Sequence, residues 1–510
     1  MLTILTKTNV QETIKSAIAS VERLDELVEI QSDENAISIS NKILYVSGDI
    51  ITSSLDWHDT EPPYIIPRIP FSEMNLLAMV FYKLGNHQKA FEFISEENEL
   101  YNHLLIATHL QFGYEISEDM CAFAKSNLGD SRPKGERSVK AESSHNHCII
   151  LQYRNSTTPQ DVNALKGLYA EAIASATNDE HRLFTIKHFV NLLIDNNMLS
   201  EAEKILRISS PKAISEEAKN AMTTQLATVL MAQLKLPYDT SVLNEIQELQ
   251  LASIAFYEDK ELKVNAGLVY VDASEIANYQ EDFITSKNYI TKAILYFKEA
   301  DIPEFLGEAG LRKATLLYTW SKNGSPQYYK PAINAFQDTL KVFKRDTHPQ
   351  KFADIHHNLA LIYSEIPVSP EEKPIWTAFC ASSFKEVLAF YTKEEYPYEY
   401  AMASHNYATA LMNFPEAKLH NNLDKAFGLF EDALSVRSEK EYPFERALTL
   451  LNQLELYWLM HNEDEKAEKE KYHQMLEKAT SITTIVEDEN IIEQANQHLN
   501  QLKNLKTILN

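Results

Sequence analysis

Three asparagines and one arginine recur at nearly equal spacing in the second half of the sequence. Arg312, Asn358, Asn406 and Asn452 follow one another at intervals of 46, 48 and 46 residues. A carboxamide offers a hydrogen-bond donor and an acceptor together, so it suits binding to a peptide backbone and equally a hydrogen bond between neighbouring helices. With the histidines that directly precede two of them, they are the candidate partner-binding residues: Arg312, His357, Asn358, His405, Asn406 and Asn452.

The same intervals separate four prolines, and these place the helix boundaries. Pro303, Pro349, Pro397 and Pro443 are 46, 48 and 46 residues apart. Proline suits the first turn of a helix and drives the residue before it towards extended backbone. Because one helical hairpin cannot bury its apolar face alone, the units are predicted to stack on one another. A small residue that permits close helix packing follows each proline by four positions: Gly307, Ala353, Ala401 and Ala447.

The composition favours helices and argues against several classes of enzyme. Of 510 residues, 44% are hydrophobic and only 11 are glycine, whereas glycine usually makes up about 7% of a protein. Helices need little glycine, but phosphate-binding loops and tight β-hairpins need more. The sequence contains no GxxxxGK[ST], GxGxxG, HExxH or GxSxG motif and no kinase signature set. We therefore predict an all-α chain that is not an enzyme and has no cofactor and no metal site.

One repeat unit carries a family resemblance. The unit from Leu388 to Ala408, which includes Tyr396-Pro397, is followed by a second copy from Leu434. It resembles the long-period tetratricopeptide arrays of bacterial signalling proteins, most specifically over residues 285–460 and less so over 71–105. Its period of 46–48 residues departs from the usual 34. Such arrays often accompany a caspase-like CHAT protease domain with a His-Gly pair, but no His-Gly dipeptide occurs in this sequence.

The resemblance implies both a fold and a binding mode. The fold is a right-handed α-α superhelix, a solenoid of antiparallel helical hairpins. In similar arrays, including kinesin light chain and the O-linked N-acetylglucosamine transferase, an asparagine before a Leu-Ala pair faces the concave groove and hydrogen-bonds an extended peptide. Asn358 precedes Leu359-Ala360 and fits this pattern, Asn406 and Asn452 fit it in part, and Arg312 departs from it. An inter-repeat hydrogen bond remains the alternative role.

The N-terminal region has weaker repeat character. A helix is expected from Thr8 to Glu29 and a second from Asp33 to Leu55, although the β-branched residues from Ile37 to Val46 leave a strand open. The prolines between 62 and 70 predict an extended connector. The predicted organisation is an N-terminal helical region with one hairpin (1–124), a polar flexible loop (125–160), degenerate repeats (161–284), the regular array (285–487) and a C-terminal capping helix (488–510).

The polar segment from Lys125 to His147 is predicted to be a flexible loop, because it is basic and poor in core-forming residues. Its end, His145-Asn146-His147-Cys148, could bind a metal ion, but no second ligand cluster is evident, and a solvated loop is the favoured interpretation. The three cysteines are widely separated and odd in number, so they predict no disulfide framework.

The net charge of −25 disfavours binding to nucleic acid. The acidity indicates either a well-solvated surface or a preference for a basic partner. The first residues lack the apolar core of a signal peptide, and no stretch approaches the roughly 18 apolar residues of a membrane span. We therefore expect no membrane partner and a cytoplasmic location.

These features favour a scaffold or adaptor that binds a peptide or protein segment, in the bacterial signalling or protease-linked setting that the resemblance implies. One alternative is a peptide-sensing regulator in which ligand binding changes the superhelix. Another is an enzyme with an unrecognised site in residues 1–160, where the repeat pattern is weakest.

Overall fold

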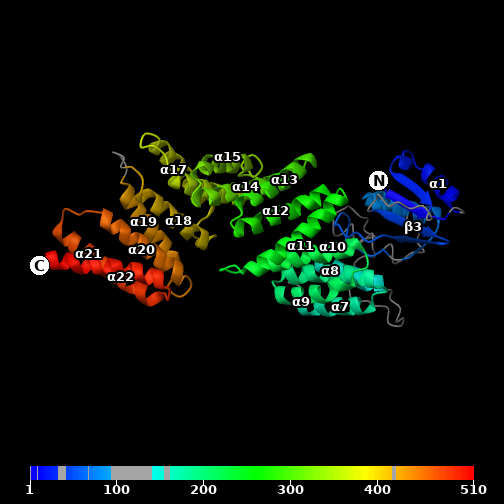
Figure 1. Cartoon of the computed structure of the whole chain (residues 1–510), viewed down its shortest axis with the longest axis horizontal. Coiled ribbons are helices and arrows are strands. Elements are labelled where there is room, and N and C mark those ends of the chain that lie inside the picture. The colour runs from blue at the N-terminus through cyan, green and yellow to red at the C-terminus, as the bar shows by residue number, and fades with distance from the viewer. Residues whose placement is uncertain are drawn as a thin grey trace. The chain divides into compact units, whose positions relative to one another are not determined.

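The computed structural model describes residues 2–7, 10–32, 42–66, 68–93, 141–153, 161–415 and 421–509. They fall into two compact units, residues 1–269 and 270–510, and each unit is described by itself below. Helices and strands carry the labels of Figure 1. None of the helices among the described residues combines the length and the apolarity that crossing a membrane requires.

The first unit begins with a five-stranded sheet rather than with helices. The strand order is β2-β1-β3-β4-β5; β1 runs parallel to β2 and β3, and the β3–β4 and β4–β5 pairs are antiparallel. The register places Leu2 beside Val28 and Thr3 beside Ile43. The elements are β1 (Leu2–Thr6), α1 (Gln11–Ala19), η1 (Leu24–Glu26), β2 (Val28–Ser32), β3 (Ile43–Ser47), β4 (Ile50–Ser53) and β5 (Ile69–Pro70).

The sheet corrects the expectation of a helical N-terminal region. The helix predicted over residues 8–29 ends at Ala19, and the second predicted helix is replaced by β3 and β4 where it is described. The cause is the β-branched content, because residues such as Ile43 and Val46 pack well on a pleated surface. Strand β1 is buried along its whole length, as is typical of a strand between two parallel neighbours, and such a strand shows no alternation.

The hairpin predicted near residues 71–105 is present as far as the structure describes it. Helices α2 (Glu73–Lys83) and α3 (His87–Glu92) pack against each other. Gly85 lies between them with a φ of +83°, a backbone conformation that glycine adopts at little cost. Ala90 is fully buried, as a helix crossing requires. Residues 94–105 lie outside the described residues.

The rest of the first unit is an array of helices around α8. Residues Leu183 to Val190 of α8 are all buried, including the polar Lys187 and His188. Helix α6 includes residues 141–147, so the end of the predicted loop is helical; residues 125–140 lie outside the described residues. The helices are α6 (Ala141–Tyr153), α7 (Val162–Ser175), α8 (Asp179–Asp195), α9 (Leu199–Ser209), η3 (Ser210–Lys212), α10 (Glu216–Ala232), α11 (Thr240–Asp259) and the start of α12 (Lys263–Tyr279), whose residues 270–279 belong to the second unit.

The second unit is a stack of antiparallel helices, which confirms the helical-repeat fold class for this part of the chain. Pro303, Pro349, Pro397 and Pro443 each begin a helix, as predicted. Each proline-initiated helix packs most closely on the α-helix that follows it, and Figure 1 shows the pair α18 and α19 side by side. The helices are α13 (Phe283–Glu299), α14 (Pro303–Lys322), η4 (Pro326–Tyr328), α15 (Tyr329–Thr339), α16 (Pro349–Glu365), α17 (Lys373–Phe390), α18 (Pro397–Met412), α19 (Asn422–Val436), α20 (Pro443–Leu459), α21 (Glu465–Ile485) and α22 (Glu489–Leu509).

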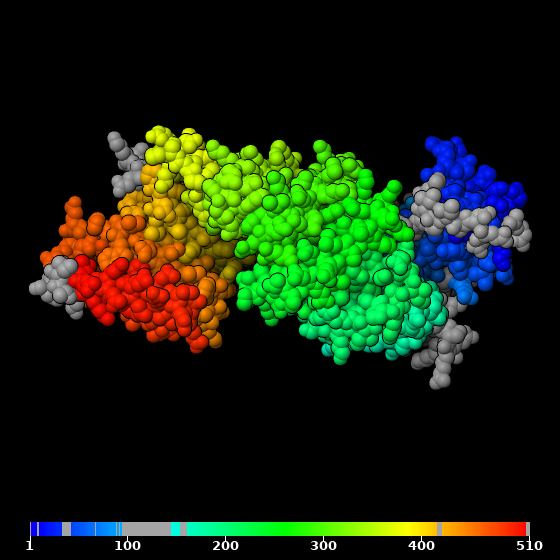
Figure 2. Space-filling model, in the orientation of Figure 1, coloured from blue at the N-terminus to red at the C-terminus, as the bar shows by residue number. Residues whose placement is uncertain are grey.

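The last helix of the second unit covers the apolar face of the final repeat. Ile491, Ala495 and Leu502 of α22 are buried in one cluster with Leu450 and Leu454 of α20. In Figure 2 the side chains of α21 and α22, in orange and red, lie against one another. The packing agrees with the predicted position of a capping helix; its effect on solubility remains a prediction.

Candidate interaction surfaces

All six candidate residues lie on helices that begin the repeats. Arg312 is on α14, His357 and Asn358 on α16, His405 and Asn406 on α18, and Asn452 on α20. His357 is buried, and the other five side chains are partly exposed. The structure brings most of these residues into contact in a way that the spacing alone did not specify.

The asparagines of α18 and α20 form hydrogen bonds with the histidine of the preceding repeat. Asn406 Nδ2 donates to His357 Nε2 over 2.9 Å. In the next pair, Asn452 Nδ2 donates to His405 Nε2 over 3.2 Å and contacts Thr409 Oγ1 at 3.1 Å. The same relationship therefore links α16 to α18 and α18 to α20. It corresponds to the inter-repeat role that the sequence analysis left open.

Arg312 and Asn358, the two earlier residues of the recurring series, have different partners. Arg312 forms an ion pair with Glu275 of α12, with 2.7 Å between Nη2 and Oε2. Asn358 donates Nδ2 to the carbonyl of Asp354 in its own helix over 2.9 Å. One repeat before His357 the equivalent position is Leu311, an apolar residue that offers Asn358 no acceptor.

Burial keeps both histidines neutral, as acceptors of these hydrogen bonds must be. Burial lowers the pKa of His357 to about 4. Burial, with a contribution from the Arg437 guanidinium, lowers the pKa of His405 to about 4. His405 Nδ1 lies 3.2 Å from Thr449 Oγ1. Because Nε2 accepts from Asn452, the proton of the neutral His405 ring is on Nδ1, which donates to Thr449.

Arg437 marks a change of residue type in the core of the last regular repeat. The equivalent positions of the three earlier repeats hold Phe297, Phe343 and Tyr391, each almost fully buried. Arg437 is also buried, and its Nη1 donates to Thr449 Oγ1 over 2.7 Å and to the carbonyl of Glu445 over 3.2 Å. The guanidinium therefore holds Thr449 in place beneath His405.

The side-chain oxygens of the three recurring asparagines are available to accept hydrogen bonds. Among the described residues, Oδ1 of Asn358, Asn406 and Asn452 forms no hydrogen bond, whereas Nδ2 of each is engaged. We call the surface formed by these three residues and Arg312 the amide face. Asp354 and Glu455 lie one turn from Asn358 and Asn452 on the same helices, so the acceptors stand beside carboxylates. Such a surface suits a partner that supplies hydrogen-bond donors.

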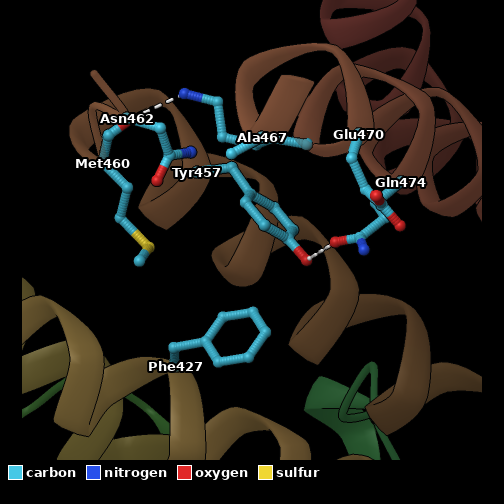
Figure 3. A pocket seen from close by; sticks show the side chains of 8 residues that line it. Phe427, Tyr457, Met460, Asn462, Ala467, Glu470 and Gln474 are labelled. Carbon is cyan, nitrogen blue, oxygen red and sulfur yellow. Dashed lines mark hydrogen bonds between the residues drawn. The ribbon is translucent and has the colours of Figure 1, made fainter. Parts of the chain in front are cut away.

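A small pocket lies at the end of the array, between α19, α20 and α21. It has a volume of about 260 Å³, below the size of most small-molecule sites. Figure 3 shows the Phe427 and Tyr457 rings on its apolar side and the Tyr457 hydroxyl donating to Gln474 Oε1 over 2.9 Å. Lys471 Nζ donates to the Met460 carbonyl over 2.6 Å. The pocket could accommodate one side chain of a partner.

An aromatic cluster that the sequence analysis did not single out lies on α16 and α17. The rings of Tyr363, Trp376 and Phe379 lie 5.6 to 6.0 Å from one another. Phe379 is 50% exposed and Ile375 is 56% exposed. Exposed aromatic residues are enriched at protein interfaces. The spacing of Ile375 and Phe379, four residues apart on one helix face, was the available signal.

The first unit contains a second surface that sequence reasoning missed. Asn146 of α6 binds the backbone of Ile65 with both groups of its amide: Oδ1 accepts from the Ile65 N–H over 2.8 Å, and Nδ2 donates to the Ile65 carbonyl over 2.9 Å. The adjacent His145 places Nε2 2.9 Å from the Pro63 carbonyl. These two residues are buried in a helix, not solvated in a loop as expected.

The His145 to Cys148 sequence is not arranged to hold a metal ion. Both ring nitrogens of His145 have protein partners, because Nδ1 contacts Thr185 Oγ1 at 3.0 Å. Burial, with the nearby Glu171 carboxylate, raises the pKa of the Cys148 thiol to about 12, so the thiolate that would bind a metal is disfavoured. Across the described part of the chain, no group of three His, Cys, Asp or Glu side chains is placed to bind a metal ion. Cys148 and Cys380 are free and buried.

No protein-family model and no curated protein matches the sequence. Solved structures resemble the chain at low identity. A signal transduction ATPase with numerous domains from Pyrococcus horikoshii, which has a tetratricopeptide repeat sensor, is 12% identical, with 97% of this chain and 82% of that chain covered and a TM-score of 0.44. Yeast Tom70 is 12% identical, with 86% and 89% covered and a TM-score of 0.33. The Cut9–Hcn1 complex of the APC/C is 13% identical, with 84% and 86% covered and a TM-score of 0.32.

Proposed function

We propose that the chain is a protein–protein interaction scaffold, and that the amide face binds an extended or helical segment of another protein. The observation that carries the proposal is that the two polar atoms of each amide, Nδ2 and Oδ1, have different roles. In Asn406 and Asn452, Nδ2 is held by a histidine of the neighbouring repeat while Oδ1 has no partner among the described residues. The inter-repeat hydrogen bond orients an acceptor that is free for a ligand.

Such acceptors select a partner by its hydrogen-bond donors. Backbone N–H groups of an extended segment can meet successive repeats, and lysine or arginine side chains can meet both amide oxygens and neighbouring carboxylates. The net charge of −25 favours the same basic class of partner. Each neutral hydrogen bond contributes only about 0.5–1.5 kcal/mol net, so binding depends on several repeats acting together.

We further propose a non-enzymatic, cytoplasmic role in a bacterial signalling or protease-linked system. Support for this setting comes from the repeat pattern of residues 285–460, which resembles the arrays of such proteins.

A peptide-sensing regulator is the second candidate, and one observation favours it. The bonds from His357 to Asn406 and from His405 to Asn452 form a consecutive series across α16, α18 and α20. A ligand that donates a hydrogen bond to Oδ1 of one of these asparagines therefore binds a side chain whose Nδ2 also bonds to the neighbouring repeat.

Asn358 offers the cleanest test of the proposed scaffold function, because its Nδ2 bonds only within its own helix. Asn358→Ala should leave the melting temperature almost unchanged and weaken capture of the partner. The matched control is Asn413→Ala, since Asn413 also donates Nδ2 to a carbonyl four residues earlier, Thr409, over 3.2 Å.

The partner is first identified by affinity capture from native cells, as a protein recovered in stoichiometric amount with the wild-type chain. Its dissociation constant is then measured for the wild type and both variants, and for the triple variant Asn358→Ala, Asn406→Ala, Asn452→Ala. Weaker binding by Asn358→Ala but not by Asn413→Ala supports the amide face. Equal affinity of the folded triple variant and the wild type contradicts it.

A further inference from the structure

Residues 54–66, here called the docking segment, lie between β4 and β5 and contact α6, α8 and α11 of the first unit. Glu61 of the segment also forms a buried ion pair with Lys83 of α2, with 2.6 Å between Oε2 and Nζ. The indole of Trp57 packs edge-on against Phe184 of α8, with 5.2 Å between ring centroids. The His58 ring lies 6.2 Å from the rings of both Phe256 and Tyr257 on α11. Helix α6 supplies the third contact, through Asn146. The segment is thus a loop of the sheet that is bound by the helical array.

The helices bind the backbone of this segment as they would bind a separate peptide. Asn146 satisfies both the N–H and the carbonyl of Ile65, and His145 Nε2 donates to the carbonyl of Pro63. An asparagine of the first unit thus binds the backbone of an extended segment through both groups of its amide, whereas the asparagines of the amide face offer Oδ1 alone. Backbone contacts of this kind hold an extended segment with little demand on its sequence.

Side chains add sequence preference. Lys187 of α8 is almost fully buried, and its Nζ lies 2.6 Å from Asp59 Oδ1 and 3.3 Å from the Trp57 carbonyl. The Asp59 carboxylate is 64% exposed, so it reaches Lys187 from the outer side of the contact. Trp57 and Ile65 are themselves buried. The surface therefore recognises an aromatic anchor, a carboxylate two residues later and an aliphatic residue eight residues after the anchor.

The contact also contains polar atoms that it does not satisfy. Nδ1 of His58 and both ring nitrogens of His188 are buried without a hydrogen-bond partner among the described residues. His188 lies 4.8 Å from Phe184 and 5.7 Å from His145, measured between ring centroids, so it adjoins the contact with the docking segment. Unsatisfied buried groups weaken an interface relative to its apolar area, which favours exchange of the bound segment.

We propose that α6, α8 and α11 form a peptide-recognition surface whose resident ligand is the docking segment, and that an acidic, aromatic segment of a partner protein exchanges with it. This surface is distinct from the amide face. It presents the Lys187 ammonium to a carboxylate, whereas the amide face presents acceptors to donors. The two surfaces therefore select partner segments of opposite charge.

A synthetic peptide with the sequence of residues 54–66, labelled with a fluorophore, is the probe. The tethered segment competes at an effective concentration in the millimolar range, so the full-length wild type should bind the probe only weakly. The double variant Trp57→Ala, Asp59→Asn weakens the resident segment without altering the receptor helices or the sheet core, to which neither residue belongs. It should bind the probe at least about tenfold more tightly in fluorescence anisotropy.

Receptor variants in the same background locate the site. Adding Asn146→Ala or Lys187→Met should abolish the gain, whereas the control Lys219→Met, at an exposed lysine of α10, should not. A folded double variant that binds the probe no better than the wild type overturns the proposal, and so does a gain that survives Asn146→Ala.

A measurement on the wild-type chain tests the proposal without variants, which could fail to fold. Saturating unlabelled probe should accelerate amide hydrogen exchange at Ile65, whose N–H is held by Asn146. If the rate of amide hydrogen exchange at Ile65 does not change under saturating probe, the probe does not displace the docking segment and the proposal is overturned. Neither measurement involves the amide face. If the proposal for the docking segment fails, the proposed scaffold function is therefore unaffected and is decided by its own experiment.

Discussion

Asn406 and His357 are 49 positions apart in the sequence, yet Asn406 Nδ2 lies 2.9 Å from His357 Nε2, which joins α18 to α16. Asn452 and His405 repeat this relationship one unit later. A helical solenoid is stabilised mainly by contacts between neighbouring units. These hydrogen bonds therefore join neighbouring units at the same side chains that we propose for partner binding.

The first prediction concerns the coupling between His357 and Asn406. Either alanine substitution leaves the other side chain without its partner, so each should lower the free energy of unfolding by about 1–3 kcal/mol. The double variant should lose less than the sum, with a coupling energy of about 0.5–1.5 kcal/mol in a urea-denaturation cycle.

The control cycle for that pair combines His357→Ala with Asn413→Ala, because the Asn413 amide, just after the end of α18, donates only to the Thr409 carbonyl of that helix. This cycle should be additive within about 0.3–0.5 kcal/mol. Additive effects for His357 and Asn406 as well would show that their hydrogen bond contributes nothing measurable to the stability of the array.

The second prediction is a loss of stability in mild acid. The pKa values of His357 and His405 are lowered from 6.5 to about 4, so the unfolded chain takes up protons before the folded chain does. Their contribution to stability is complete above about pH 6.5, decreases as the pH falls, and is lost near pH 4. The melting temperature should decline across this window.

Other buried histidines contribute to that decline, so the test compares two chains. In the variant His357→Gln, His405→Gln, the glutamine carbonyl can still accept from the asparagine but does not titrate in this range. Its melting temperature should depend less steeply on pH between 6.5 and 4 than that of the wild type. Parallel curves would show that these two histidines are not protonated on unfolding.

The helix boundaries of the second unit were predictable because proline acts locally. Pro349 and Pro397 constrain their own φ and the residue before them whatever lies around them, and each begins a helix. The pairing of His357 with Asn406 was not predictable in the same way. Both residues were singled out, but their contact depends on how one repeat stacks on the next, which the spacing does not determine.

The first unit shows where sequence patterns fail. Strand β1 is buried on both faces, so Leu2 to Thr6 has none of the alternation that identifies a half-buried strand. In α6, polar composition around His145 and Asn146 indicated a solvated loop. Their polarity is instead matched by the backbone of Pro63 and Ile65, more than 80 positions away in the sequence, a contact that no local pattern reveals.

The third prediction tests the close packing of α14, at Gly307, against the turn that follows α15. A Cβ atom on Gly307 would lie 3.0 Å from Phe343 Cζ and 3.0 Å from Val342 Cγ1. Because a buried aromatic ring has little room to move, Gly307→Ala should destabilise the chain by about 1–3 kcal/mol. Thermal unfolding followed by circular dichroism measures the effect.

Gly428 provides the matched control, since a Cβ there would meet no atom within 4 Å. It lies inside α19, so Gly428→Ala should stabilise the chain by roughly 0.5–1 kcal/mol through helix propensity alone. Opposite signs for the two glycine variants would confirm the packing argument. A stabilising Gly307→Ala would contradict it.

The fourth prediction concerns the C-terminal helix. Deleting residues 488–510 removes Ile491, Ala495 and Leu502 from their cluster and exposes Leu450 and Leu454 of α20 to water. Since a solenoid without its terminal cap presents a continuous apolar face, the shortened chain should melt at a lower temperature and aggregate in light scattering. The variant Leu499→Lys, Leu502→Lys should reproduce the defect in part at full length, whereas Asn500→Lys and Gln501→Lys, on the polar side, should not. A shortened chain as soluble and heat-stable as the whole one would show that α22 packs on the array without protecting it.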